Sequence, residues 1–170
     1  MKKIGLFGGC FNPPTDVHIN LAKKALKENK LDKVIFVPVG DCYPKENLEK
    51  AIHRYNMLKI ATKDCDNIEV DDIELRISTN ICAVDIFKLL SEKYKEDDIY
   101  FIMGSDNYEK MPNWKEYNYI KEKYKYIILE RDCNIINSTE IRKKMLKNED
   151  VSEYLSQDLI RYIKNNNLYK

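Results

Sequence analysis

The sequence predicts an α/β protein built on a doubly wound, parallel, five-stranded sheet. Short, nearly continuous apolar runs alternate with longer amphipathic segments through most of the 170 residues, and this alternation is typical of β-α-β units. Parallel strands are covered by helices on both faces, which explains why these runs lack a two-residue period. The chain has no internal repeat or linker and is too short for two ordinary cores. We therefore expect one domain over residues 1–170, with helices at its C-terminal end.

Each strand is expected where an apolar run stands between polar or glycine-containing segments. Helices fill the gaps, where apolar residues recur with helical spacing. Right-handed crossovers place the loops after the strands at one edge of the sheet, which is where such folds bind ligands. The expected strands are residues 2–7, 33–38, 68–72, 98–103 and 124–129, and the expected helices are 16–28, 48–62, 80–94, 114–122, 138–147 and 158–165.

The loop after the first strand has the composition of a phosphate-binding turn. A glycine pair lets the backbone turn sharply and approach a ligand, and a proline pair delays the next helix. His18 then lies in the first helical turn, where backbone N–H groups and the helix dipole favour an anion. The alternative is a glycine turn followed by a solvated histidine. We expect the anion to lie against Gly8, Gly9, Cys10, Phe11, Thr15 and His18.

A second anion site is predicted near the C-terminal end. Asn137 and Glu140 have the spacing of a capping box, so Ser138 and Thr139 would present hydroxyl and N–H groups at a helix start. Arg142 lies about one turn further along, where its planar guanidinium can hold two phosphate oxygens. An ordinary capped amphipathic helix is the alternative, and the first loop disfavours it because both segments point to the same chemistry.

Together the two motifs resemble the signature of the adenylyl- and cytidylyltransferase superfamily. There, Gly-x-Phe-x-Pro precedes a His-x-x-His or Thr-x-x-His element, here Thr15-x-x-His18, and a Ser-Ser/Thr-x-Ile-Arg element follows, here with Asn137 in place of the first Ser. The Asn-Pro-x-Thr-x-x-His form is similar to that of nicotinate and nicotinamide mononucleotide adenylyltransferases. The resemblance implies a Rossmann-like nucleotidyltransferase fold, with His18 and Arg142 as catalytic residues at the α-phosphate of ATP.

Further positions extend the resemblance to nearly the whole chain. Gly104 and Asp106 match a Gly-x-Asp element, in which the carboxylate accepts ribose hydroxyls; a helix cap is its alternative role. Lys45 and Arg131 match cations that reach phosphates; a solvated loop lysine is the alternative for Lys45. Arg54 belongs to an Arg-x-x-Met pattern of the family, and residues 155–169 follow the family's ending.

The acceptor side matches the family less well. Trp114 resembles a tryptophan that stacks on the pyridine ring, although a single tryptophan is also typical of a core. Where bacterial nicotinate mononucleotide enzymes tend to carry Ser-Tyr-Thr, this chain has Ile81-Cys82-Ala83. A hydroxyl donor is lost, so backbone N–H groups near Ala83 are left to contact the pyridine substituent. The choice between the acid and the amide therefore stays open, with the acid favoured.

The reaction that the resemblance implies transfers AMP from ATP to a pyridine mononucleotide and releases pyrophosphate, in NAD biosynthesis. Mg²⁺ is expected with the ATP, because substrate phosphates usually hold this ion with few protein ligands. Two alternatives stay open: another adenylyl- or cytidylyltransferase, such as pantetheine-phosphate adenylyltransferase, and a non-catalytic nucleotide-binding protein. A hydride-transfer enzyme is disfavoured because the first loop is not Gly-x-Gly-x-x-Gly.

Composition and net charge limit the binding partners and the cellular location that we expect for the protein. A formal net charge of +1 leaves no basic field for nucleic acid, and no apolar stretch approaches the roughly 20 residues of a membrane span. Five cysteines without a Cys-x-x-Cys pair, and only two histidines, support neither a disulfide framework nor a protein metal site. The chain start has no export signal, so we expect a cytoplasmic protein, with a homo-oligomer left open.

Overall fold

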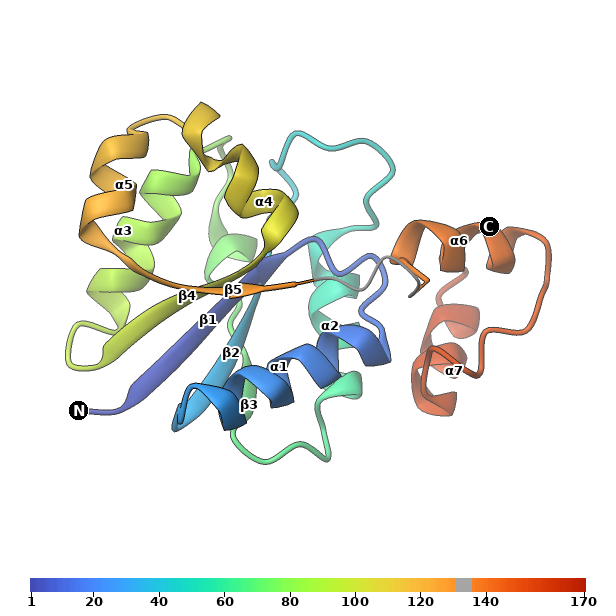
Figure 1. Cartoon of the computed structure of the whole chain (residues 1–170). Helices are drawn as coiled ribbons and strands as arrows, with labels where there is room; N and C mark the ends of the chain where they lie inside the picture. The colour runs from blue at the N-terminus through green and yellow to red at the C-terminus, as the bar shows by residue number, and fades with distance from the viewer. Residues whose placement is uncertain (131–135) are drawn as a thin grey trace.

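A computed structural model, which describes residues 1–130 and 136–170, confirms the parallel five-stranded sheet (Figure 1). Its strands are β1 (Lys3–Gly9), β2 (Lys33–Pro38), β3 (Ile68–Val70), β4 (Asp98–Gly104) and β5 (Lys125–Leu129). The order across the sheet is β3-β2-β1-β4-β5, and the neighbouring strands run parallel. The strand order reverses between β1 and β4, which is where doubly wound sheets open a ligand crevice.

Helices cover both faces of this sheet (Figure 1). In the described residues they are α1 (Asp16–Glu28), α2 (Ala51–Ala61), α3 (Ala83–Lys93), α4 (Ser105–Lys110), α5 (Tyr117–Lys123), α6 (Ser138–Leu146) and α7 (Gln157–Asn165). On one face, Ala22 of α1 and Leu58 of α2 pack against the strands, and on the other Phe87 of α3 and Ile120 of α5 do so. A third apolar cluster joins α2, α6 and α7 at the end of the molecule where both motifs meet.

The first helix illustrates why these segments fold as they do. Thr15 stands before it in extended conformation, as an N-cap does. Ile19, Ala22 and Ala25 then recur at three-residue spacing and are buried, so one stripe of the helix faces the sheet. The expected bounds of this helix and of β2 are confirmed.

Two strand ends differ from the expected ones by two residues, for local reasons, and the other strand boundaries differ by at most one residue. The first strand runs on to Gly9, because Gly8 and Gly9 pair with Val37 and Pro38 of β2. The third strand ends at Val70 instead of residue 72. There the Asp71 carboxylate accepts the Ile73 N–H at 2.9 Å, which begins a short 3₁₀ helix, Ile73–Arg76.

Three helices also start later than expected. The segment 48–62 becomes helical only at Ala51, whose N–H donates to the Asp41 carboxylate at 2.6 Å. The segment 80–94 becomes helical at Ala83, after the capping interaction between the Cys82 N–H and Asp85. The helix expected over 114–122 is α5, displaced towards its C-terminal end because Glu116 has a left-handed φ of 57°. The short helix α4 was not expected.

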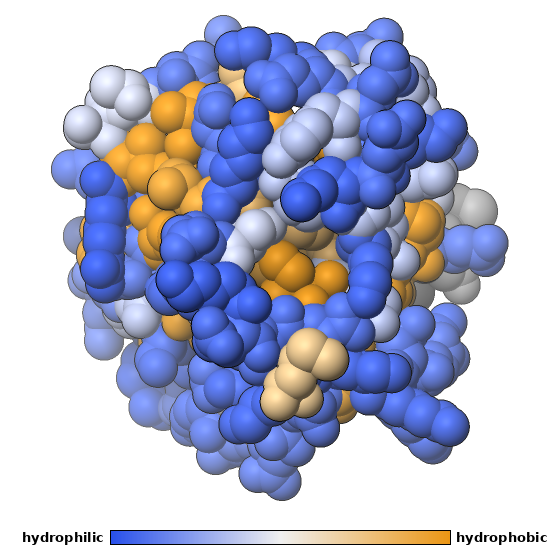
Figure 2. All heavy atoms as spheres, turned by 90° about the vertical axis from the view of Figure 1, so that its left-hand side faces the viewer, coloured by the Kyte–Doolittle hydropathy of each residue, from blue (hydrophilic) through white to orange (hydrophobic). Residues whose placement is uncertain are grey.

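One face of the surface is seen from the side of α3 and α5. The flank on the side of α3 and α5 is mostly hydrophilic, with hydrophobic residues in a central hollow and in one patch (Figure 2). Among the described residues, no helix is long and apolar enough to cross a membrane. The cysteines described, at 10, 42, 65 and 82, are free thiols.

Candidate active site

A cleft of about 930 Å³ opens at the carboxyl ends of β1 and β4. It is where the strand order places it, and side chains from both motifs face it. Arg131 lies outside the described residues. Every other residue that the sequence assigned to a site lines this cleft, namely Gly8, Gly9, Cys10, Phe11, Thr15, His18, Lys45, Ala83, Gly104, Asp106, Trp114, Ser138, Thr139 and Arg142. The structure therefore brings them to one place, and their roles there stay predictions.

The phosphate turn, which we define as residues 8–12, does not turn where the sequence suggested. Gly8 and Gly9 are still in the strand, and Phe11 is the residue with a left-handed φ, of 48°. The Phe11 ring is buried edge-on to both Phe7 and Phe36, and this packing offsets the cost of the left-handed φ. Gly9 is needed for that ring, since a Cβ would lie 2.8 Å from it. Apart from its two chain neighbours, no residue in the described part of the chain comes within 4 Å of where a Gly8 Cβ would stand, so this position leaves room beside the cleft.

The imidazole of His18 is oriented by Thr15. Its Nδ1 accepts the Thr15 N–H at 3.0 Å and lies 2.9 Å from the Thr15 hydroxyl oxygen. Because Nδ1 accepts a hydrogen bond, the ring proton belongs on Nε2, and His18 is a donor from that atom. Thr15 itself is buried. Its place in the site is therefore behind His18, with its hydroxyl directed at the imidazole.

The C-terminal motif is bonded directly to the phosphate turn. Ser138 Oγ donates to the Pro13 carbonyl at 2.9 Å, and Arg142 Nη1 donates to the Asn12 carbonyl at 2.7 Å. The other arm of Arg142 reaches the Thr139 hydroxyl at 3.2 Å. The expected capping box is confirmed: Glu140 N–H donates to the Asn137 side chain, and the Asn137 N–H donates back to Glu140, both at 3.0 Å. Two segments about 130 residues apart in sequence thus form one wall of the cleft, where the sequence predicts anion binding.

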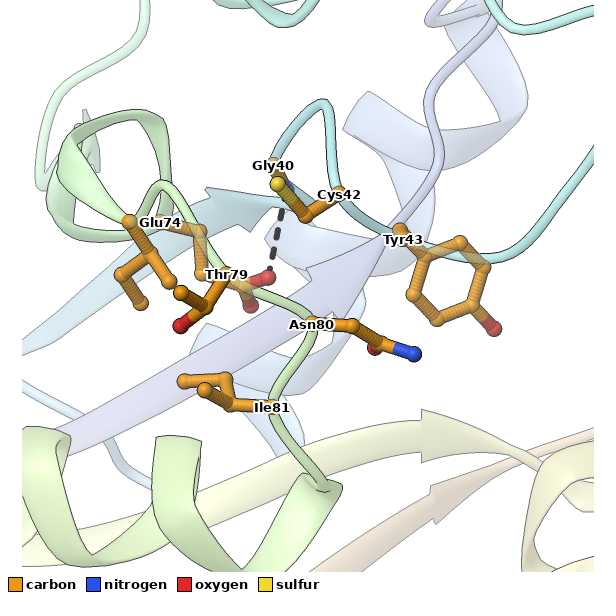
Figure 3. A pocket seen from close by; sticks show the side chains of 8 residues that line it. Gly40, Cys42, Tyr43, Glu74, Thr79, Asn80 and Ile81 are labelled. Atoms are coloured by element: carbon orange, nitrogen blue, oxygen red, sulfur yellow. Dashed lines mark hydrogen bonds between the residues drawn. The ribbon is translucent and has the colours of Figure 1, made fainter.

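The turn after β2 carries a cation to the same wall. Lys45 is exposed, and its Nζ lies 3.7 Å from the Cys10 sulfur. Beside this turn, a cavity of about 20 Å³, the size of one water molecule, adjoins the main cleft (Figure 3). Tyr43, Glu74 and Ile81 line both spaces. Burial raises the pKa of Glu74 from 4.5 to about 7, opposed by the Gly40 N–H and the Arg54 charge.

Aromatic and small residues line the part of the cleft where the sequence predicts the acceptor. Trp114 lies edge-on to Phe87, with ring centroids 6.3 Å apart, so one part of it packs on the core while another lines the cleft. Ala83 is the first residue of α3 and also faces the cleft. Asp106 stands in the first turn of α4, whose N-cap is Gly104, so the alternative role of Asp106 as that cap is wrong.

Three residues next to the site were not singled out as site residues. The side chain of Asn12 is buried and accepts hydrogen bonds from the Glu49 N–H and the Tyr169 hydroxyl. Glu74 accepts the Gly40 N–H. Asn12 stands within the first motif, but Glu74 and Tyr169 lie 62 and 157 positions from it. No local pattern marks contacts of such range.

Comparisons with known proteins agree with this geometry. The cytidylyltransferase-like family model matches residues 6–161. A probable nicotinate-nucleotide adenylyltransferase of Lactococcus lactis is 32% identical over 187 residues, covering 99% of this chain and 96% of the relative. The chain belongs to the nicotinate-nucleotide adenylyltransferase family. It is therefore a nucleotidyltransferase.

Other members of this family give the same picture. A probable nicotinate-nucleotide adenylyltransferase of Maridesulfovibrio salexigens is 41% identical over 122 residues, which are 71% of this chain and 56% of that relative. Among solved structures, the Plasmodium falciparum nicotinic acid mononucleotide adenylyltransferase complexed with NaAD matches with a TM-score of 0.82 at 25% identity, covering 99% of this chain and 98% of that one. The fold and the element order of the enzyme are thus those of its family.

Proposed function

We propose that the enzyme transfers AMP from ATP to nicotinate mononucleotide, with release of pyrophosphate, in NAD biosynthesis. An oxygen of the acceptor's phosphate attacks the α-phosphorus, a new P–O bond forms, and the bond from that phosphorus to the pyrophosphate oxygen breaks. The attacking phosphate is already ionised, so no protein base is needed. The observation that carries the proposal is the joining of the two motifs through the Arg142–Asn12 and Ser138–Pro13 bonds at one cleft.

The residues of the cleft suit a transfer that depends on alignment and charge neutralisation. We assign His18 Nε2–H and the Arg142 guanidinium to the α-phosphate, where negative charge is redistributed as the new bond forms. Ser138 and Thr139 supply donors beside them, and Lys45 reaches the phosphates from the opposite loop. Asp106 is assigned to the ribose hydroxyls.

Mg²⁺ is assigned to the substrate and not to a protein cage. In residues 1–130 and 136–170 no group of three or more His, Cys, Asp or Glu side chains could hold a metal ion. Substrate phosphates commonly provide most of the ligands of Mg²⁺. When bound, the ion would neutralise charge on the departing pyrophosphate.

Nicotinate is preferred over nicotinamide as the acceptor ring on the names of the relatives. The chain offers no hydroxyl at Ala83, so backbone N–H groups at the start of α3 are the donors we assign to the carboxylate. Trp114→Ala tests the assignment of the ring to Trp114. The Michaelis constant for the mononucleotide should rise about tenfold, because aromatic stacking and its buried area contribute roughly 1.5 kcal/mol. That for ATP should stay within twofold. Equal losses for both substrates would assign Trp114 to the core alone.

The reaction itself is tested by pyrophosphate release. ATP and CTP are each supplied with nicotinate mononucleotide, nicotinamide mononucleotide or phosphopantetheine, and we expect turnover with ATP and a pyridine mononucleotide. Turnover with phosphopantetheine alone would favour the second candidate reaction of this superfamily. Tight ATP binding without turnover on any acceptor would indicate a nucleotide-binding protein. The cytoplasmic location, the single domain over residues 1–170 and the oligomeric state remain predictions from the sequence.

A further inference from the structure

The peptide that joins Val39 to Gly40 is held at both ends by charged side chains. Its carbonyl accepts a hydrogen bond from Arg54 Nη2 at 2.7 Å. Its N–H donates to Glu74 Oε2 at 3.2 Å, the dashed line in Figure 3. A single peptide plane thus lies between a guanidinium and a carboxylate. Arg54 belongs to the Arg-x-x-Met pattern, to which the sequence assigned no substrate contact, and Glu74 belongs to none of the motifs identified in the sequence.

Arg54 is also hydrogen-bonded to the phosphate turn. Its Nη1 donates to the Cys10 carbonyl at 2.9 Å and its Nε to the Glu49 carbonyl at 2.7 Å, and the side chain is fully buried. The Val39 N–H in turn donates to the Gly9 carbonyl at 3.0 Å. Two consecutive carbonyls of the phosphate turn are therefore fixed from the β2 side.

Fixing those carbonyls also fixes the donors of the turn. In a planar trans peptide the C=O and the N–H point in opposite directions. The Cys10 and Phe11 N–H groups are thus turned away from Arg54 and Val39. This direction has to be imposed, because Phe11 has a left-handed φ of 48° that costs free energy in a non-glycine residue.

Glu74 approaches the peptide through backbone contact that only glycine permits. A Cβ on Gly40 would lie 2.5 Å from the Glu74 carbonyl oxygen. The 3₁₀ helix Ile73–Arg76 therefore sits directly against the turn after β2. Glu74 also lines the cleft, so the residue that holds Gly40 borders the site itself.

We propose that Arg54 and Glu74 are positioning residues which, by gripping the two ends of the Val39–Gly40 peptide, direct the N–H groups of the phosphate turn towards ATP. The proposal rests on the proposed function in one respect, that the phosphate turn binds the triphosphate. Arg54 donates three hydrogen bonds, and each goes to a backbone carbonyl of the loops around the site. Its contribution is thus one of direction.

The test compares variants that keep or remove the hydrogen bonds that Glu74 and Arg54 make to these loops. Glu74→Gln keeps an acceptor oxygen for the Gly40 N–H, whereas Glu74→Leu removes it; Arg54→Lys and Arg54→Met form the second pair. Arg76→Met is the matched control, because Arg76 stands on the same 3₁₀ helix but is exposed and bonds Asp72. Michaelis constants for ATP and for nicotinate mononucleotide are measured with the thermal midpoint of each variant.

We expect Glu74→Leu to raise the Michaelis constant for ATP about tenfold, the effect of losing one hydrogen bond to a charged group. The constant for the mononucleotide should change less than twofold. Glu74→Gln should recover the ATP constant to within about threefold, and Arg76→Met should match the wild type. Equal losses in Glu74→Gln and Glu74→Leu, or equal losses for both substrates in Glu74→Leu, would overturn the proposal.

Calorimetric measurement of ATP binding separates failure of the proposed function from failure of the positioning role. If the Arg54 variants do not fold, the Glu74 pair decides alone. If the wild type binds ATP but turns over no acceptor, the proposed function fails, while the ratio of ATP dissociation constants between Glu74→Leu and Glu74→Gln still decides the positioning role. A ratio near one overturns it.

Discussion

His18 has its donor direction set before any substrate binds, because Thr15 occupies Nδ1 from its backbone and lies beside it with its hydroxyl. A donor held in this way costs little to reorganise as charge develops in the transition state. We predict that His18→Ala lowers the turnover number by about a hundred- to a thousandfold, the usual effect of removing one such donor. Circular dichroism should show an intact fold. A folded variant with the wild-type rate would remove His18 from the mechanism.

The raised pKa of Glu74 predicts that the free energy of unfolding depends on pH. Its folded pKa of about 7 lies above the ordinary 4.5, so the folded protein holds this proton more tightly than the unfolded chain. Stability therefore falls as pH rises from about 4.5 to 7 and is level above that. Each pKa unit corresponds to about 1.4 kcal/mol. Urea unfolding of Glu74→Gln and wild type should show the variant gaining about 2 kcal/mol relative to wild type between pH 5 and pH 8. A difference that does not change with pH would contradict the raised pKa.

Single residues of the site were predictable where the chemistry is local. The sequence points to His18 and Arg142 because each follows a helix N-cap, Thr15 or Asn137, within a few residues. The grip of Arg54 on Cys10 joins residues 44 positions apart, and that of Glu74 on Gly40 spans 34. Such pairs depend on how the elements pack, and a single sequence does not encode them in any nearby pattern.

The start of α6 shows how one element positions a side chain that we propose to be catalytic. Asn137 caps it, and Ser138 and Arg142 then reach the phosphate turn. We predict that Asn137→Ala lowers the free energy of unfolding by about 1 kcal/mol and also lowers turnover, because the cap positions both side chains. Ser156→Ala is the matched control, since Ser156 caps α7 and does not line the cleft. It should cost similar stability in urea unfolding and leave turnover unchanged. Equal turnover in the two variants would separate the cap from catalysis.

Elements were predictable where apolar spacing continues up to a clear cap. The bounds of α1 and β2 follow from the sequence for that reason. The sequence placed the turn at Gly8 and Gly9, which is too early. The preceding residue, Phe7, pairs with both β2 and β4, and the two glycines continue the pairing with β2. The helix expected from Trp114 failed at Glu116, where a left-handed residue interrupts it. Neither feature has a signal in composition.

Over the whole molecule, the last residues close on the first loop. The Tyr169 hydroxyl donates to Asn12 Oδ1 at 2.8 Å, and the Tyr169 N–H donates to Glu49 at 3.2 Å. We predict that Tyr169→Phe lowers the free energy of unfolding by about 1 kcal/mol, the usual net contribution of one buried hydrogen bond. The Michaelis constant for ATP should also rise, because Asn12 belongs to the phosphate turn. Tyr162→Phe, which alters a contact between α2 and α7, is the control and should leave that constant unchanged. If Tyr169→Phe and Tyr162→Phe have the same Michaelis constant for ATP, the contact of Tyr169 with Asn12 does not contribute to ATP binding.

The overall architecture was the most predictable level, since alternating strands and helices with right-handed crossovers allow few arrangements. What the pattern does not give is the closure of the C-terminal segment onto the N-terminal loop. That closure rests on Arg142 and Tyr169 reaching Asn12 across more than 120 residues.

The central claim is adenylyl transfer to a pyridine mononucleotide, and steady-state pyrophosphate release with ATP and nicotinate mononucleotide tests it most directly. We predict turnover that requires both substrates, is far slower with CTP, and has a higher kcat/KM for nicotinate than for nicotinamide mononucleotide. A strong preference for the amide would contradict the choice of acceptor. Turnover with CTP alone would contradict the claim itself.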